Sequence, residues 1–223
     1  MNNFKAFTFL FILLLSTTGC THEKARILII GDSISIGFTP FVKEQLADVA
    51  DVFHNPGNAK HTGYGLENIT SWLQEGEWDI IQFNWGLWDL CYRHPDSETQ
   101  GNRDKINGKI TFNLEKYESQ LDALVKIIIE KSQAKLIFLT TTYVPDHEAG
   151  RFAEDAKKYN NIACSVMKAN GVTINDLYKV SKGIHLDHGK GDNNVHYTPK
   201  GYEALAQHVS AFLKLEIKLI SKN

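Results

Sequence analysis

Short apolar runs alternate with longer amphipathic stretches along most of the chain. Five runs are rich in β-branched or aromatic residues and have the length of strands: 26–30, 49–53, 78–83, 135–140 and 172–174. Between and after them, apolar residues recur at helical spacing in 41–50, 66–73, 114–128, 152–167 and 199–219. This alternation predicts an α/β fold, with a mostly parallel five-stranded sheet covered by helices on both faces. The polar segment 92–111 has neither period, and we expect an excursion at the rim of the sheet.

The first twenty residues follow a different pattern. Lys5 precedes an apolar run over 6–15, and small residues lead from there to Cys20. This is the plan of a secretory signal, and the run is too short to cross a bilayer as a helix. The Gly19-Cys20 ending is similar to a bacterial lipoprotein signal, in which Cys20 becomes the lipidated first residue, although Thr17 stands where such signals usually carry leucine. The alternative is an ordinary cleaved signal with an incidental cysteine.

We therefore expect residues 1–20 to be a signal segment and residues 21–223 to be one domain. The lipid on Cys20 would attach the protein to a membrane of a bacterial cell envelope, on its periplasmic or outer surface. A net charge of −2 with scattered basic residues gives no electrostatic reason to expect nucleic acid. In an exported protein Cys91 and Cys164 either pair or remain buried free thiols, and the sequence leaves both possibilities open.

Two residues far apart in the chain have the chemistry of a nucleophile and its base. Ser33 follows the first predicted strand in Gly31-Asp32-Ser33, and His196 precedes the last predicted helix. A serine hydroxyl needs a base to take its proton, and a histidine suits that role near neutral pH. Taken alone, Ser33 is more typical of a helix cap, because Asp-Ser commonly follows a strand in that role. Neither the Gly-x-Ser-x-Gly elbow nor a phosphate-binding loop occurs in the chain.

Together, the early Gly-Asp-Ser, the turns after the second and third strands and the late histidine resemble the SGNH/GDSL hydrolase family. The resemblance covers essentially the whole chain after residue 20. It implies a three-layer α/β/α, flavodoxin-like fold and ester hydrolysis through an acyl-enzyme, with no metal and no organic cofactor. Ser33 would be the nucleophile and, through its backbone N–H, one donor to the oxyanion. His196 would be the base.

The resemblance implies two further oxyanion donors. A glycine of the second block supplies a backbone N–H, for which Gly57 is our choice and Gly63 the reserve. The third block departs from the family pattern Gly-x-Asn-Asp, because Trp88 occupies the asparagine position in Gly86-Leu87-Trp88-Asp89. We expect Asn84 or the indole N–H of Trp88 to replace the missing donor. Alternatively, Trp88 is only a wall of the pocket.

The acidic residue that orients the histidine also departs from the family pattern. The family places an aspartate three residues before the histidine, and this chain has Asn193 there. We expect Asp192, displaced by one residue, to orient His196. Asp187 or a backbone carbonyl is the alternative, and with a carbonyl the enzyme would work as a dyad.

Two polar clusters remain. His185, Asp187 and His188, with Asp192 and His196, are of the types that bind metal. The intervening glycine-rich run is more typical of a solvated loop, so we expect no metal site. Charged residues between 146 and 151 follow the fourth strand and are most simply solvated loop charge, or else line the pocket rim: Asp146, His147, Glu148 and Arg151.

The resemblance and the signal together predict an exported serine esterase whose partner is a small-molecule or carbohydrate ester. O-acetyl groups on carbohydrate are the expected substrate class. The alternatives are a lipid or lysophospholipid esterase, and an inert carbohydrate-binding or scaffold protein that keeps the fold alone.

Overall fold

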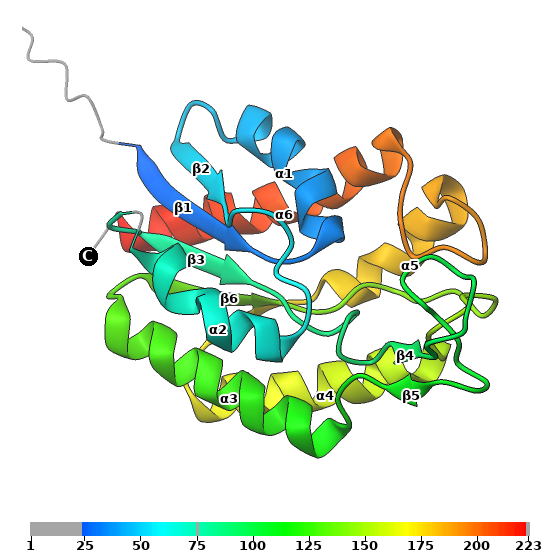
Figure 1. Cartoon of the computed structure of the whole chain (residues 1–223). Coiled ribbons are helices and arrows are strands. Elements are labelled where there is room, and N and C mark those ends of the chain that lie inside the picture. Colours follow the sequence, from blue (N-terminus) through cyan, green and yellow to red (C-terminus); the bar gives the residue numbers. More distant parts are fainter. Residues whose placement is uncertain (1–23, 75, 222–223) are drawn as a thin grey trace, which may run out of the picture.

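A parallel sheet forms the centre of the protein. The computed structural model describes residues 24–74 and 76–221. Its five-stranded sheet has the order β2-β1-β3-β6-β7, and every neighbouring pair is parallel (Figure 1). The strands are β1 (Ala25–Ile30), β2 (Ala50–His54), β3 (Ile80–Phe83), β6 (Lys135–Leu139) and β7 (Thr173–Asn175). The predicted α/β fold is confirmed, and the strand order is that of a flavodoxin-like sheet, whose direction of winding reverses between β1 and β3.

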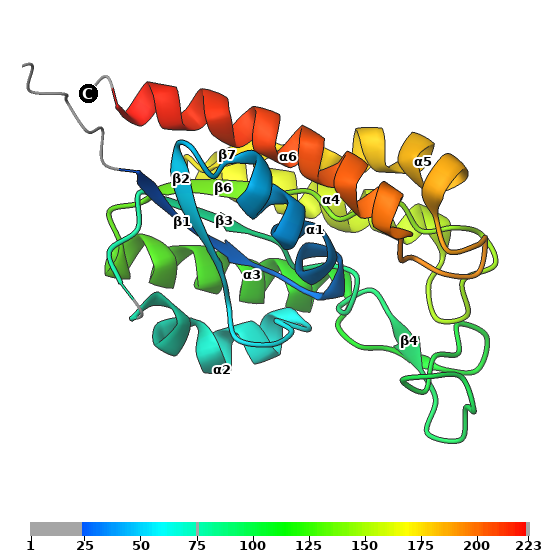
Figure 2. The same ribbon diagram turned by 90° about the horizontal axis from the view of Figure 1, so that it is seen from above.

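Helices cover both faces of this sheet. On one face α1 (Ser33–Gln45) and α5 (Leu177–His188) pack against α6 (Pro199–Ile220). On the other face α3 (Leu114–Lys131) packs between α2 (Thr62–Leu73) and α4 (Ala153–Ala169). Figures 1 and 2 show the three layers from two sides. Because β1 lies between two strands and between two helical layers, its residues Ile27 to Ile30 are completely buried.

Two helices differ from the sequence prediction. α1 begins at Ser33 rather than near residue 41, because the buried Asp32 side chain caps it by accepting a hydrogen bond from the Ile34 N–H (2.9 Å). α5 lies where no helix was predicted. Its buried residues Leu177, Ser181 and His185 recur every fourth position, but two of the three are polar. The buried stripe therefore carried little apolar signal.

The polar segment 92–111 forms a small projection of its own. Its two short strands, β4 (Tyr92–Arg93) and β5 (Lys109–Ile110), pair antiparallel outside the main sheet (Figure 1). The backbone N–H groups of Tyr92 and Lys105 donate to the carbonyls of Gly150 and Ala149 (2.7 Å each). The predicted excursion is thus fastened to the loop that follows β6.

Cys91 and Cys164 are both free thiols. The predicted signal segment 1–20, with Cys20, lies outside the described residues. Within the described part of the chain, no helix has the length and apolar character needed to cross a membrane.

Candidate active site

The turns after β1, β2 and β3 are fastened to one another at the carboxyl edge of the sheet. The Gly31 N–H donates to the Asn55 side-chain oxygen (2.9 Å), and the Ala59 N–H donates to the Gly31 carbonyl (2.9 Å). On the other side, the Asn84 N–H donates to the Ile30 carbonyl (3.0 Å). Polar side chains from three strands therefore meet where the winding of the sheet reverses, which is where such sheets bind their ligands.

Ser33 and His196 meet at this edge although 163 residues separate them. Ser33 is the first residue of α1, and His196 lies on the loop between α5 and α6. The Ser33 Oγ is 2.9 Å from the His196 Nε2, which is hydrogen-bond distance. The contact pairs a hydroxyl with an imidazole in the geometry that proton transfer requires.

Asn194 holds the other side of the imidazole ring. Its Oδ1 is 2.8 Å from the His196 Nδ1 and also accepts the His196 backbone N–H at 3.0 Å. Since a backbone N–H can only donate, the atom facing it is the amide oxygen. The Nδ1 therefore carries the ring proton, and the Nε2 lone pair is left to accept the Ser33 hydroxyl.

The loop that carries Asn194 is itself supported by α5. The His185 Nε2 is 2.7 Å from the Asn194 carbonyl oxygen, and the His185 ring packs edge-on against Tyr143 and Tyr197. His185 is thus a buried structural residue. In the described part of the chain, no three or more histidine, cysteine or acidic side chains are grouped so as to hold a metal ion.

The expected acid partner of His196 needs correction. The Asp192 carboxylate is 78% exposed and lies 3.9 Å from the His147 Nε2. Asp187 is exposed on α5. The structure brings neither carboxylate to the Nδ1 of His196, because the Asx turn formed by Asn194 already fills that position.

The surroundings of His196 favour its neutral form. Burial has the largest effect, and the positive charges of Arg151, Lys190 and Arg103 act in the same direction, so that the pKa of His196 lies below its usual value. Glu148 opposes this shift only in part. The imidazole is therefore available as a base, although the residue that orients it contributes no negative charge.

The expected oxyanion donors differ in what they contact. The backbone N–H groups of Ser33 and Gly57 have no acceptor within the described residues, and Gly57 has the positive φ (66°) of a tight turn. The Asn84 Nδ2 donates to the Leu139 carbonyl (2.7 Å) and to the Thr141 hydroxyl (3.2 Å). Both amide hydrogens are thus engaged, and the structure does not support the prediction for Asn84.

Trp88 is half-buried, and the guanidinium of Arg93 lies 4.8 Å from the centre of its ring. Its indole N–H has no acceptor within the described residues, so Trp88 stays a candidate donor. The reserve glycine, Gly63, lies in the first turn of α2 against the Phe112 ring. Trp85 is fully buried, and its indole N–H donates to the Ala59 carbonyl (3.3 Å), which makes it a core residue.

A second serine–histidine pair lies near the first. The Ser35 Oγ is 2.7 Å from the His54 Nε2 and also donates to the Asp32 carbonyl (2.7 Å). Ser35 is buried within α1, whereas Ser33 is only partly buried. Accessibility to a substrate therefore distinguishes Ser33 from Ser35.

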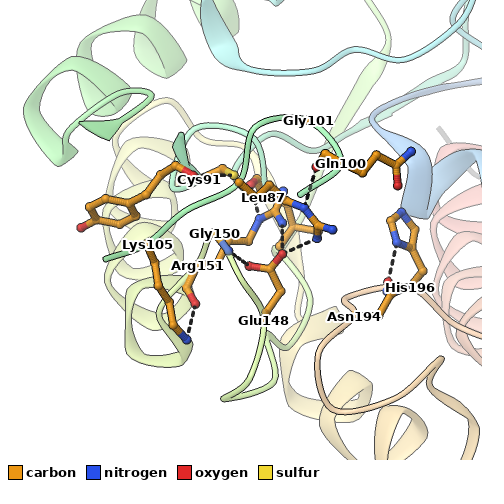
Figure 3. A network of polar contacts seen from close by, with 12 residues as sticks. Leu87, Cys91, Gln100, Gly101, Lys105, Glu148, Gly150, Arg151, Asn194 and His196 are labelled. Atoms are coloured by element: carbon orange, nitrogen blue, oxygen red, sulfur yellow. Dashed lines mark hydrogen bonds and ion pairs between the residues drawn. The ribbon is translucent and has the colours of Figure 1, made fainter. Parts of the chain in front are cut away.

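The expectation of solvated loop charge is wrong for Glu148 and Arg151. The Glu148 side chain is completely buried, and its Oε1 accepts hydrogen bonds from Arg151 Nη1 (2.9 Å) and Arg103 Nη1. The Arg151 Nε donates to the Leu87 carbonyl at 2.6 Å. This cluster joins the loop after β6, the excursion 92–111 and the turn that carries Trp88 (Figure 3). In the sequence, this cluster is indicated only by the number of charged residues between 146 and 151.

Comparison with known proteins identifies the family. The model of the GDSL-like lipase/acylhydrolase family matches residues 29–204. The chain belongs to this family. It is accordingly a hydrolase of ester bonds, as the resemblance to SGNH/GDSL hydrolases implied. A search of curated protein sequences found no match.

Solved structures show the same fold at low sequence identity. A lipase/acylhydrolase from Enterococcus faecalis is 19% identical, with a TM-score of 0.68, and the alignment covers 86% of this chain and 96% of that one. An acetyl xylan esterase, AlAXEase, is 16% identical (TM-score 0.65; 83% and 98% covered). The acetylxylan esterase Axe2 from Geobacillus stearothermophilus is 14% identical (TM-score 0.65; 83% and 92% covered).

Proposed function

We propose that this protein removes acetyl groups from carbohydrate esters through an acyl-enzyme on Ser33. The observation that carries the proposal is the 2.9 Å contact between the Ser33 Oγ and the His196 Nε2, with the opposite ring nitrogen held by Asn194. A partly buried serine paired with a neutral, oriented imidazole is the arrangement that activates a hydroxyl nucleophile.

In the first half-reaction, the Ser33 Oγ attacks the ester carbonyl carbon while its proton passes to the His196 Nε2. The carbonyl oxygen becomes an oxyanion, which the free N–H groups of Ser33 and Gly57 stabilise. The intermediate collapses when the C–O bond to the sugar breaks, and the departing alcohol takes the proton from His196. Asn194 keeps the ring in place throughout.

In the second half-reaction, His196 takes a proton from a water molecule, whose oxygen attacks the acyl-enzyme carbonyl. Collapse breaks the bond between the acyl carbon and the Ser33 Oγ, which takes the proton back from His196, and releases acetic acid, which ionises to acetate. Every proton is transferred to or from the His196 Nε2, so the steps require no group beyond the residues of the site, substrate and water.

The substrate class rests on three supports. The chain is a member of an ester-hydrolase family, two of the structures with its fold are acetylxylan esterases, and the half-buried Trp88 ring follows the strand next to β1. Aromatic rings at such edges stack on sugar faces. The predicted export would also place the protein where cell-wall and plant polysaccharides are met.

Covalent labelling tests the nucleophile directly. A fluorophosphonate should add once to the protein, and peptide mass spectrometry should locate the adduct on Ser33, because only an activated serine displaces fluoride at a useful rate. The Ser35→Ala variant should still label, since the Ser35 hydroxyl is buried. A label on another residue, or no label in protein that hydrolyses aryl acetates, would exclude Ser33 as the nucleophile.

We further propose that the mature protein begins at Cys20 and is anchored by a lipid. The support is the apolar run over 6–15 followed by Gly19-Cys20. Mass spectrometry of protein expressed in a bacterium should find a diacylglyceryl group on Cys20 in the membrane fraction, and Cys20→Ser should release the protein. If the chain were cleaved at another residue and the protein were found in the soluble fraction, the proposed lipid anchor would be wrong and the segment would be an ordinary secretory signal.

A further inference from the structure

Two arginines share one carboxylate beside the proposed nucleophile. Arg103 and Arg151 both donate to the Glu148 Oε1, while the Glu148 Oε2 accepts the Gly150 N–H (2.8 Å). The cluster therefore holds two positive charges and one negative charge. Burying an uncompensated charge is costly, so an incoming anion that pairs with the excess positive charge would be bound favourably.

Both guanidinium groups are fixed and have donors to spare. The Arg103 Nε donates to the Gln100 carbonyl (2.9 Å), and the Arg151 Nε donates to the Leu87 carbonyl. In each arginine the Nη2 has no hydrogen-bond partner within the described residues. The side chain of Arg151 is 6% exposed and that of Arg103 is 19% exposed. Donors held in this way lose little entropy when they bind a planar anion.

The excess positive charge lies close to the catalytic pair. The loop that carries Glu148 and Arg151 is fastened to the loop that carries His196, since the His147 N–H donates to the Asp192 carbonyl (3.2 Å). Arg103 and Arg151 act on the ionisation of His196, so their charge reaches the ring. Asp104, the acidic neighbour of Arg103, is used within its own turn, where it accepts the N–H groups of Ile106 and Asn107 (2.9 Å each).

We propose that Arg103 and Arg151 form a subsite for a carboxylate of the substrate, so that the preferred ester is an acetylated sugar acid. Arg103 is the specificity-determining residue, because it is the more accessible of the two and does not hold the Leu87 carbonyl. The inference deepens the proposed function and rests on it. The contacts of Glu148 show that the two guanidinium groups can donate hydrogen bonds to one carboxylate.

A bound carboxylate also supplies what the orienting residue lacks. When His196 takes the proton from Ser33, it becomes a cation held by a neutral amide and surrounded by positive charge. A substrate anion paired with Arg103 would offset that charge when the imidazolium forms. The acidic substrate should therefore have a higher kcat as well as a lower KM than its uncharged analogue.

Two matched substrates test the subsite: an O-acetylated methyl glucuronoside and its primary amide, which have nearly the same shape and differ only in the carboxylate or amide group. We expect wild-type kcat/KM for acetate release to favour the acid by at least about 10-fold, since hydrogen bonds between charged groups are worth that much. Arg103→Gln should bring the ratio close to one, and Arg103→Lys should restore part of it. Lys109→Gln removes an exposed positive charge from the same excursion and should keep the wild-type ratio.

A binding measurement supplies a readout other than turnover. Millimolar glucuronate should raise the Tm of the wild-type protein, and glucuronamide should not. Arg103→Gln should lose this response, and its ligand-free Tm should be lower because the buried Glu148 loses one of its two arginine partners. Equal rates for acid and amide, in protein that hydrolyses an aryl acetate, would overturn the subsite and leave the proposed function standing. Failure to hydrolyse any of these esters would overturn both.

Discussion

Replacement of Ser33 by alanine is expected to lower kcat/KM for a short-chain aryl acetate by about 10³-fold or more, because the acyl-enzyme can no longer form. The residual rate would come from binding and from the remaining oxyanion donors, with water as the attacking group. The measurement is the release of phenol from the aryl acetate by the wild-type protein and by its Ser33→Ala variant, at matched protein concentration and with Tm recorded for both.

Two further variants make this result specific. Ser35→Ala removes the hydroxyl of the other serine–histidine pair and should retain the burst of phenol that marks an acyl-enzyme. The double variant Ser33→Ala, His196→Ala should be no slower than the slower single variant, since residues that act as a unit lose their effect together. Equal turnover by wild type and Ser33→Ala would show that Ser33 is not the nucleophile.

The fold could be predicted from the sequence because its signals are local. Each strand of the main sheet is a short apolar run, and α3, α4 and α6 carry apolar residues at helical spacing. α5 could not be recognised in this way, because its buried face includes Ser181 and His185, which form hydrogen bonds with residues outside the helix. When polar residues occupy buried positions of a helix, the apolar residues no longer recur at helical spacing.

The sequence predicted the site residues whose side-chain type indicates their chemistry. It did not predict the hydrogen-bond partners that are determined by the conformation of the loops. Ser33 and His196 could be paired from their places at a strand end and a helix start. The contact between Asn194 and His196 depends on a local Asx turn. The family pattern points to position 193 and gives no indication of this turn. The pairing of Glu148 with Arg103 spans 45 residues and could not be predicted from spacing.

The neutral partner of His196 has a consequence for pH. In a triad with an aspartate, the nearby negative charge raises the histidine pKa and stabilises the imidazolium. Here burial and then Arg151, Lys190 and Arg103 lower that pKa, and only Glu148 opposes them. Because the base works when unprotonated, activity should persist to a lower pH than a histidine of ordinary pKa would allow.

Asn194→Ala is expected to lower kcat/KM by about 10²- to 10³-fold, since the ring loses the acceptor that fixes its tautomer and orientation. The matched control is Asn193→Ala, at the exposed neighbouring position where the family carries its aspartate. That variant should keep nearly full activity. The reverse result, with Asn193→Ala inactive and Asn194→Ala active, would show that the family position orients His196 and that the Asn194 contact does not.

Asn194→Asp separates orientation from charge. The carboxylate would keep an acceptor at the Nδ1 and add a negative charge, which raises the pKa of His196. The acidic limb of the kcat/KM profile should then move to higher pH by the same amount, because His196 must lose its proton before it can accept that of Ser33. Above the new pKa the variant should equal or exceed wild type, since the imidazolium formed in the transition state gains a counter-charge. An unchanged acidic limb would mean that residue 194 does not contact the catalytic ring during turnover.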